Sequence, residues 1–137
     1  MAENQVGEAL WSSAELERLD AAQELEIGVR RADGTLRRAV PIWVVRAGSH
    51  VYVRTWHRRD TGWFGQALRT RRAHVRVEGL AADVAVEDVG EGSPERRAAV
   101  DAAYRVKYGG FGDAGVGNMV SGSAAAATLQ LVPLRRP

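Results

Sequence analysis

Residues 24–56 read ELEIGVRRADGTLRRAVPIWVVRAGSHVYVRTW, and this stretch decides the fold. Apolar residues alternate with polar residues or glycine over 25–29, which is the period of a half-buried strand. The pair Asp33-Gly34 is a strong signal for a tight hairpin turn. The return strand is expected over Leu36–Val45, where Pro41 indicates a sheet edge or a bulge because proline cannot donate to the ladder. The stretch therefore begins an antiparallel meander.

Capping signals and periodicity predict the elements on either side of this stretch. Ser12 begins a helix that ends near Ala22, and Glu15 completes a capping box with it. Ser93-Pro94 begins a second helix, because serine is a preferred N-cap and proline suits the first helical position. The remaining elements are a turn at 47–50, a strand at 51–56, a polar loop at 57–62, a helix at 63–70, strands at 73–78 and 80–88, a helix end at 108 and a final strand at 125–134.

Six strands with interspersed helices predict a mainly β fold, a small antiparallel barrel or curled sheet with flanking helices. The length favours one domain over residues 1–137, with a helix in 1–22, barrel strands in 24–92, a helix in 93–108 and the final strand in 125–134. No run approaches the ~20 apolar residues that cross a bilayer, and the N-terminus lacks a signal-peptide pattern. We therefore expect a cytoplasmic protein with no membrane partner.

Several chemistries have no support in the sequence. The chain has no cysteine, which excludes disulfides and thiolate catalysis. Its three histidines, His50, His57 and His74, have no helical ligand spacing, so no metal site is expected. Residues 110–115 match G-x-G-x-x-G, but they follow a helix instead of a strand, so they are not a dinucleotide fingerprint. The stretch from Gly109 to Gly117 is expected to be a loop, or alternatively a mobile flap over a ligand site.

The net charge of +2 conceals an uneven distribution. Residues 1–35 carry −5, residues 36–76 carry +9 and residues 77–137 carry −2. All but one of the basic residues are arginine, which grips phosphate or carboxylate with two hydrogen bonds. The basic block at 36–76 therefore predicts an anion site.

Within this block, Arg54 and Thr55 are the strongest candidates for that site. Arg54 ends a predicted strand and is expected to share the face of Val51 and Val53. A charge on such a face is costly unless it is paired.

The other arginines of the block have simpler interpretations. Arg69, Arg71 and Arg72 close a predicted helix, where cations complement the helix dipole. A nucleic-acid surface is an alternative, in which arginines contact phosphates while Trp56 and Trp63 stack on bases. The chain has no RNA-recognition, KH or helix-turn-helix signature, so no nucleic-acid partner is expected.

A second constellation lies on the predicted helix that ends near residue 108. Tyr104 and Tyr108 are four residues apart and share one face, with Asp101 and Arg105 beside them. Lys107 is the only lysine of the chain. Two phenols and an ammonium could orient a polar substrate or act as acid and base. The structural alternative is that the tyrosine rings pack while their hydroxyls stay hydrated.

The order of these segments resembles the flavin- and deazaflavin-binding split β-barrel superfamily. This group includes pyridoxamine-phosphate-oxidase-like proteins and deazaflavin-dependent nitroreductases. The resemblance covers residues 24–134 and rests on the segments 33–43, 51–55, Trp63-Phe64 with Leu68, and 74–77, while residues 103–108 resemble an uncharacterised actinobacterial subfamily.

The resemblance implies a six-stranded split barrel, a homodimer, and a cofactor in a groove near the subunit interface. By position, Arg37, Arg38, Arg54 and Thr55 would hold the cofactor phosphate. Trp56 and Trp63 would flank the ring or the substrate. The substrate side, with the catalytic groups, would consist of Tyr104, Lys107 and Tyr108.

The function implied is an oxidoreductase of secondary metabolism. It would transfer a hydride between a small organic molecule and a cofactor, an 8-hydroxy-5-deazaflavin coenzyme or alternatively FMN. Three positions depart from the nitroreductase-like pattern: Gly62 replaces a proline, Gln66 an asparagine, and Trp56 a small residue. A bulky Trp56 favours the alternative of a barrel without cofactor, either a tailoring enzyme (cyclase or isomerase) or a small-molecule-binding protein.

Overall fold

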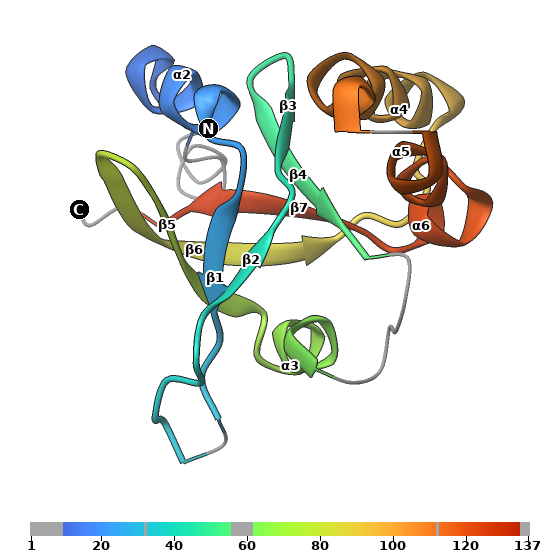
Figure 1. Ribbon diagram of the computed structural model, residues 1–137. Helices are drawn as coiled ribbons and strands as arrows, with labels where there is room; N and C mark the ends of the chain where they lie inside the picture. Colours follow the sequence, from blue (N-terminus) through green and yellow to red (C-terminus); the bar gives the residue numbers. More distant parts are fainter. Residues whose placement is uncertain (1–9, 32, 56–61, 112, 135–137) are drawn as a thin grey trace, which may run out of the picture.

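Seven strands form one antiparallel sheet in the part of the chain that the computed structural model describes, residues 10–31, 33–55, 62–111 and 113–134. Their order across the sheet is β2-β1-β5-β6-β7-β4-β3 (Figure 1). The strands are β1 (Leu25–Gly28), β2 (Val40–Ile42), β3 (Val45–Ala47), β4 (His50–Arg54), β5 (Arg72–Val77), β6 (Leu80–Asp88) and β7 (Thr128–Pro133).

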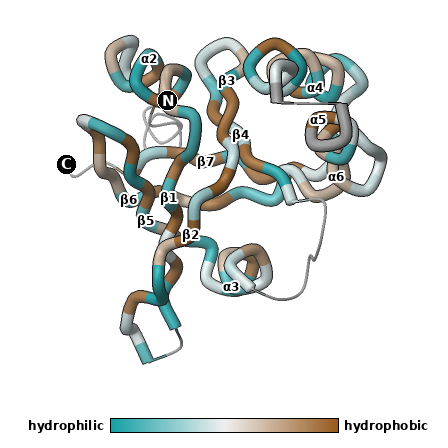
Figure 2. Tube along the Cα trace, viewed as in Figure 1, coloured by the Kyte–Doolittle hydropathy of each residue, from teal (hydrophilic) through white to brown (hydrophobic). Residues whose placement is uncertain are grey.

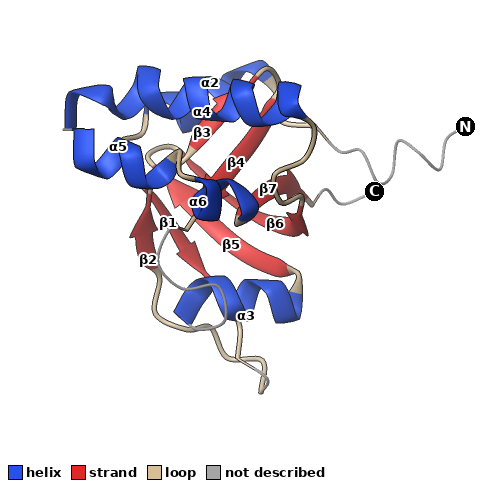
Figure 3. Cartoon of the chain, turned by 90° about the vertical axis from the view of Figure 1, so that its right-hand side faces the viewer, coloured by secondary structure: helices blue, strands red, loops and turns tan. Residues whose placement is uncertain are grey.

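Helices flank the sheet on more than one side (Figures 1 and 3). Figure 1 shows α4, α5 and α6 gathered next to β3 and β4, with α3 at the opposite end of the sheet. None of the helices within the described residues is both long enough and apolar enough to cross a membrane. The helices are α2 (Ser13–Ala21), α3 (Gly62–Thr70), α4 (Pro94–Tyr108), the 3-10 turn η1 (Gly109–Phe111), α5 (Asp113–Met119) and α6 (Gly122–Ala126).

The two edge strands of the sheet are almost continuous in sequence. β2 ends at Ile42 and β3 begins at Val45, so only Trp43 and Val44 join them. Three residue steps span at most about 11 Å, whereas the edges of a flat seven-stranded sheet would lie about 29 Å apart at the usual strand spacing. The sheet must therefore curl until its edges approach each other. We call Trp43-Val44 the joint.

The predicted meander of three consecutive strands is wrong at this joint. The expected strand over 36–45 is broken into β2 and β3, which lie at opposite edges of the sheet. The break occurs because the backbone of Val44 bonds to side chains and not to a neighbouring strand. It raises the number of strands from the expected six to seven. Pro41 does lie in an edge strand, as predicted.

Tyr108, the last residue of α4, holds the joint from one side. Its hydroxyl donates to the carbonyl oxygen of Gln23 at 2.7 Å and accepts from the amide nitrogen of Val44 at 3.1 Å. The indole of Trp43 stacks on the Tyr108 ring, with ring centres 4.1 Å apart and planes 2° from parallel. Burial raises the pKa of the Tyr108 phenol to about 12, so the hydroxyl stays protonated and keeps its donor.

Lys107 holds the same joint through its ammonium group. Its Nζ donates to the carbonyl oxygens of Leu19 and Val44 at 3.0 and 2.7 Å. It also lies 5.3 Å from the centre of the Tyr108 ring. Burial lowers the pKa of Lys107 to about 8, because desolvation disfavours its charged form.

Two apolar clusters fill the structure. Figure 2 shows hydrophobic segments recurring along the strands. The smaller cluster joins β3 and β4 to α4 and α5 and contains Val45, Tyr52, Val100, Tyr104, Tyr108 and Val116. The larger fills the barrel and includes Leu16, Leu19, Leu25, Ile27, Val51, Val53, Phe64, Ala67, Val75, Val84, Leu129 and Leu131.

The helix starts predicted from capping are confirmed. Ser12 and Glu15 form a complete capping box at α2, and Ser93 caps α4 by accepting from the Arg96 amide. The loop expected over 109–117 is wrong, because the chain there forms η1 and most of α5. The final strand begins at Thr128 instead of Ala125, because Ser121 caps the short helix α6 ahead of it.

Tyr108→Phe tests the joint. The variant keeps the ring on Trp43 but leaves the Gln23 carbonyl and the Val44 amide without their shared partner. We expect the free energy of unfolding in urea to fall by about 1–3 kcal/mol, the cost of an unsatisfied buried polar group. Val106→Ala on the same helix is the control, since Val106 is 87% exposed and should change stability by less than about 0.5 kcal/mol. Equal stability of wild type and Tyr108→Phe would contradict this role.

The pH dependence of the free energy of unfolding of Lys107→Met tests the role of Lys107 at the joint. The pKa of Lys107 falls from its ordinary 10.5 to about 8 in the folded chain. Between these values the unfolded chain binds more protons, so the contribution of Lys107 to stability rises with pH. The unfolding free energy of the wild type minus that of Lys107→Met should therefore rise by about 2 kcal/mol from pH 7.5 to 10. Val106→Ala, measured at each pH, is the control. If the wild-type value minus the Lys107→Met value stays constant or falls over this range, burial does not depress this pKa.

Candidate functional site

A pocket of about 300 Å³ opens beside the joint, where the end of β4 meets the start of α3. We call it the joint pocket. Two separate elements supply its indoles, Trp43 from the joint and Trp63 from the first turn of α3. Its lining residues are Glu24, Pro41, Ile42, Trp43, Arg54, Thr55, Trp63 and Met119.

Arg54 is the buried charge of the joint pocket, with 1% of its surface exposed. Its Nη1 donates to a carboxylate oxygen of Asp101 at 2.6 Å and to the carbonyl oxygen of Met119 at 2.8 Å. Its Nε donates to the hydroxyl of Thr128 at 2.8 Å. A buried guanidinium is stable only when it is paired and hydrogen-bonded in this way. Arg54 thereby ties the end of β4 to α4, α5 and β7.

The face expected for Arg54 is wrong. Val51 and Val53 lie in the larger core, whereas Tyr52 lies in the smaller one. The guanidinium carbon of Arg54 lies 5.5 Å from the centre of the Tyr104 ring, which belongs to the smaller core. Side chains of a strand alternate with period two, so residue 54 shares the face of residue 52.

The three residues expected on the substrate side lie beneath the joint pocket and are not among its lining residues. Tyr104 is fully buried under Arg54, and burial raises the pKa of its phenol. Its ring centre lies 6.2 Å from that of Tyr108, as expected for two tyrosines one helical turn apart. Lys107 and Tyr108 bind the backbone of the joint. The structure thus joins the arginine and tyrosine constellations, with α4 supporting the pocket from below.

The remaining residues predicted to bind a cofactor are placed differently. Arg37 lies in a neighbouring groove of about 460 Å³, and its Nη1 donates to the carbonyl oxygen of Gly62 at 3.2 Å. Arg38 is exposed. Trp56 lies outside the described residues. The groove also contains Arg31, Gln66, Arg69 and Thr70.

Trp43 and Met119 are pocket residues that the sequence did not reveal. Trp43 had one usable signal, because it follows an edge-strand proline in a stretch rich in β-formers. Met119 had none, since it ends a helix in a segment expected to be a loop. No group of three His, Asp or Glu side chains among the described residues could hold a metal ion.

No curated protein sequence matches the chain. Several solved structures resemble it in fold. The conserved hypothetical protein Rv2991 from Mycobacterium tuberculosis is 14% identical, with a TM-score of 0.62 over 93% of this chain and 84% of that chain. A putative 5-nitroimidazole antibiotic resistance protein from Bacteroides thetaiotaomicron is 14% identical, with a TM-score of 0.59 over 90% and 81%.

A FAD-binding protein from Mesorhizobium loti is 16% identical, with a TM-score of 0.59 over 91% of both chains. At these identities the likeness establishes the fold, and it confirms the split-barrel architecture expected from the sequence. A model of the family described as "Uncharacterized protein conserved in bacteria (DUF2255)" matches residues 15–131, and the chain therefore belongs to that family.

Proposed function

We propose that this chain binds a flavin-type cofactor in the joint pocket and uses it to oxidise or reduce a small organic molecule. The observation that carries the proposal is the combination of two indoles, Trp43 and Trp63, with the polar side chains of Arg54 and Thr55 in one pocket. Two structures of the same fold support it, because one is a FAD-binding protein and the other a putative nitroimidazole resistance protein.

The residues of the joint pocket fit the ring end of such a cofactor. Flavin and deazaflavin rings are flat and aromatic, and their pyrimidine edge carries hydrogen-bond acceptors. Stacking on Tyr108 fixes the plane of Trp43, so a planar ligand would meet a preset aromatic surface. The Nη2 of Arg54 has no hydrogen-bond partner in the described part of the chain, which leaves its two N–H groups for the acceptor edge.

The phosphate end of the cofactor is better assigned to other arginines. The charge of Arg54 is already balanced by Asp101 at 2.6 Å, so a phosphate would gain little from it. Arg37 bonds to the carbonyl oxygen of Gly62, one residue before Trp63 of the joint pocket. In this proposal the phosphate extends out of the pocket toward Arg37 and Arg38, whose guanidinium groups suit a phosphate.

A bound flavin or deazaflavin supplies hydride transfer. The chain's own residues then bind and orient: Trp43 and Trp63 hold the ring, and Arg54 with Thr55 fixes its polar edge. Tyr104, Lys107 and Tyr108 act as positioning residues, because they support Arg54 and the joint from beneath. The finer choices (8-hydroxy-5-deazaflavin coenzyme or FMN, and a homodimer with the cofactor near its interface) follow from the resemblance and are part of the proposal.

The alternative of a cofactor-free cyclase or isomerase has less support. It assigns acid–base chemistry to Tyr104, Lys107 and Tyr108. Tyr104 is fully buried. The polar atoms of Lys107 and Tyr108 are bonded to backbone groups. A group that exchanges protons with a substrate must reach it within hydrogen-bond distance.

Binding of FMN and of the 8-hydroxy-5-deazaflavin coenzyme tests the proposal. We expect at least one of them to bind in equilibrium dialysis, followed by cofactor absorbance, with a dissociation constant in the range of about 1–50 μM. Trp43→Leu and Trp63→Leu should each weaken binding about tenfold, the equivalent of one aromatic stacking contact. The tighter of the two ligands identifies the cofactor class.

Trp11→Phe is the matched control for these variants. Trp11 is buried, its Nε1 donates to the carbonyl oxygen of Leu131, and it does not line the joint pocket. Its replacement should leave the affinity unchanged. The proposal fails if neither ligand binds below about 100 μM, or if Trp43→Leu binds as tightly as Trp11→Phe.

A further inference from the structure

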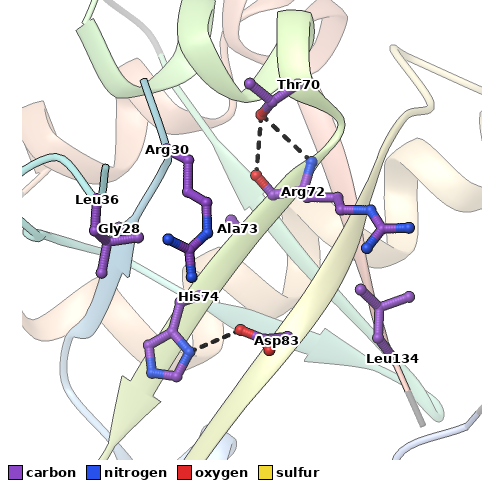
Figure 4. Close-up of a pocket in the computed structure, with 9 residues that line it drawn as sticks. All are labelled: Gly28, Arg30, Leu36, Thr70, Arg72, Ala73, His74, Asp83 and Leu134. Carbon is purple, nitrogen blue, oxygen red and sulfur yellow. Dashed lines mark hydrogen bonds and ion pairs between the residues drawn. The ribbon is translucent and has the colours of Figure 1, made fainter. Parts of the chain in front are cut away.

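A second hollow, of about 490 Å³, lies on the outer face of the sheet across β1, β5 and β6 (Figure 4). We call it the sheet hollow. On β5 the inward residues Ala73 and Val75 are buried, whereas Arg72 and His74 point to this outer face. The sheet hollow shares no lining residue with the joint pocket.

Gly28 lines the sheet hollow and puts no side chain into it. Gly28 pairs in register with His74, and His74 pairs with Asp83, so the three lie in one row across the strands. The backbone of Gly28 is not left-handed, and an added Cβ would lie 3.6 Å from Leu36, an ordinary contact. The glycine is therefore not required by backbone conformation or by crowding, and what it provides is space.

Two cations face this space. The Nη1 of the Arg30 guanidinium donates to the carbonyl oxygen of Gly34 at 2.9 Å, and Figure 4 shows the side chain extending toward His74. The guanidinium of Arg72 lies on the side of Leu134 in the same view. Within the described residues neither guanidinium forms an ion pair. Among the described residues, Asp83 is the acid that lines the hollow, and its carboxylate is bonded to Nδ1 of His74 at 3.0 Å.

A cation on the same face of the sheet, but outside the sheet hollow, forms an ion pair. Arg76, two residues beyond His74 on β5, is paired with Glu26 of β1 at 2.5 Å. Arg76 lies next to a carboxylate in the adjacent strand, whereas Arg30 and Arg72 do not. Within the described residues, the two arginines that line the sheet hollow thus lack the ion pair that Arg76 has.

The walls of the sheet hollow are apolar and exposed. Leu36 on the hairpin is 45% exposed and Leu134 after β7 is 40% exposed. Both line the hollow beside its two arginines. Exposed leucines next to arginines that have no ion pair among the described residues provide contacts for a ligand that has an apolar part and an anionic part.

We propose that the sheet hollow binds a small amphipathic oxyanion, a carboxylate or phosphate monoester carried on an apolar body. Arg30 and Arg72 hold the oxyanion through charge-assisted hydrogen bonds. Leu36 and Leu134 cover the apolar body. Asp83 orients the imidazole of His74, which leaves Nε2 as the ring nitrogen available to a further polar atom of the ligand.

Four small probes separate the two parts of this recognition. Benzoate and phenyl phosphate carry both an oxyanion and an apolar body, inorganic phosphate lacks the body, and benzyl alcohol lacks the charge. We expect benzoate or phenyl phosphate to shift the backbone amide resonances of Gly28, Ala73 and His74 in a nitrogen-15 NMR titration, with a dissociation constant of about 1–5 mM. Inorganic phosphate and benzyl alcohol should bind at least about tenfold more weakly. The tighter of the first two distinguishes a carboxylate ligand from a phosphate ester.

Variants locate the binding. Arg30→Gln and Arg72→Gln should each weaken the tighter probe about fivefold or more. Gly28→Val should abolish its binding by filling the floor, and the spectrum of the free variant reports whether it is folded. Arg76→Gln is the matched control, on the same strand and face but outside the hollow, and should leave the affinity unchanged.

The proposal is overturned by any of three results. The first is the absence of shifts with both benzoate and phenyl phosphate at about 20 mM. The second is inorganic phosphate binding as tightly as phenyl phosphate, and the third is Arg76→Gln weakening binding as much as Arg30→Gln and Arg72→Gln. None of these results depends on cofactor binding in the joint pocket, so this test and that of the proposed function fail separately.

Discussion

Two residues of backbone, Trp43 and Val44, connect the opposite edges of a seven-stranded sheet. The sheet has to curl for so short a connection to reach, and the connection itself cannot remain in a strand. Its peptide groups are buried and lose their strand partners, so they need hydrogen bonds from elsewhere. The end of α4 provides them, with the Tyr108 hydroxyl at the Val44 amide and the Lys107 ammonium at the Val44 carbonyl. The hydrogen bonds that satisfy the backbone where the barrel closes therefore also fix the position of the end of α4.

The joint pocket follows from the same arrangement. Once the end of α4 is fixed at the joint, Asp101 on that helix lies where it can pair with Arg54 at the end of β4. Trp43 is part of the joint and stacks on Tyr108, so the helix that closes the barrel also sets the orientation of an indole in the pocket. A pocket whose side chains are held by packing and hydrogen bonds of their own is preorganised for a rigid ligand. This is why the residues beneath the pocket matter to it without touching a ligand.

Local signals in the sequence predicted local features well. Ser12 and Ser93 marked helix starts because capping depends on neighbouring residues alone, and Pro41 marked an edge strand because a missing donor excludes it from the middle of a sheet. The break at Trp43-Val44 was not predictable in this way, since residues 36–45 are mostly apolar and read as one strand, and only closure of the whole sheet interrupts them. For the joint pocket, Arg54 and Trp63 were found through charge and resemblance. Met119 was missed because its place depends on how α5 packs, and the anion that pairs with Arg54, Asp101, lies 47 residues away in sequence.

In the proposed function, the joint creates a pocket that holds a flavin-type ring. Intermolecular nuclear Overhauser effects between the aromatic protons of a bound flavin or deazaflavin and the side chains of the protein test this most directly. We expect cross-peaks from the ring to the indole protons of Trp43 and Trp63. Cross-peaks that connect the ring instead to Leu36 and Leu134 of the sheet hollow, with none to Trp43, would contradict it.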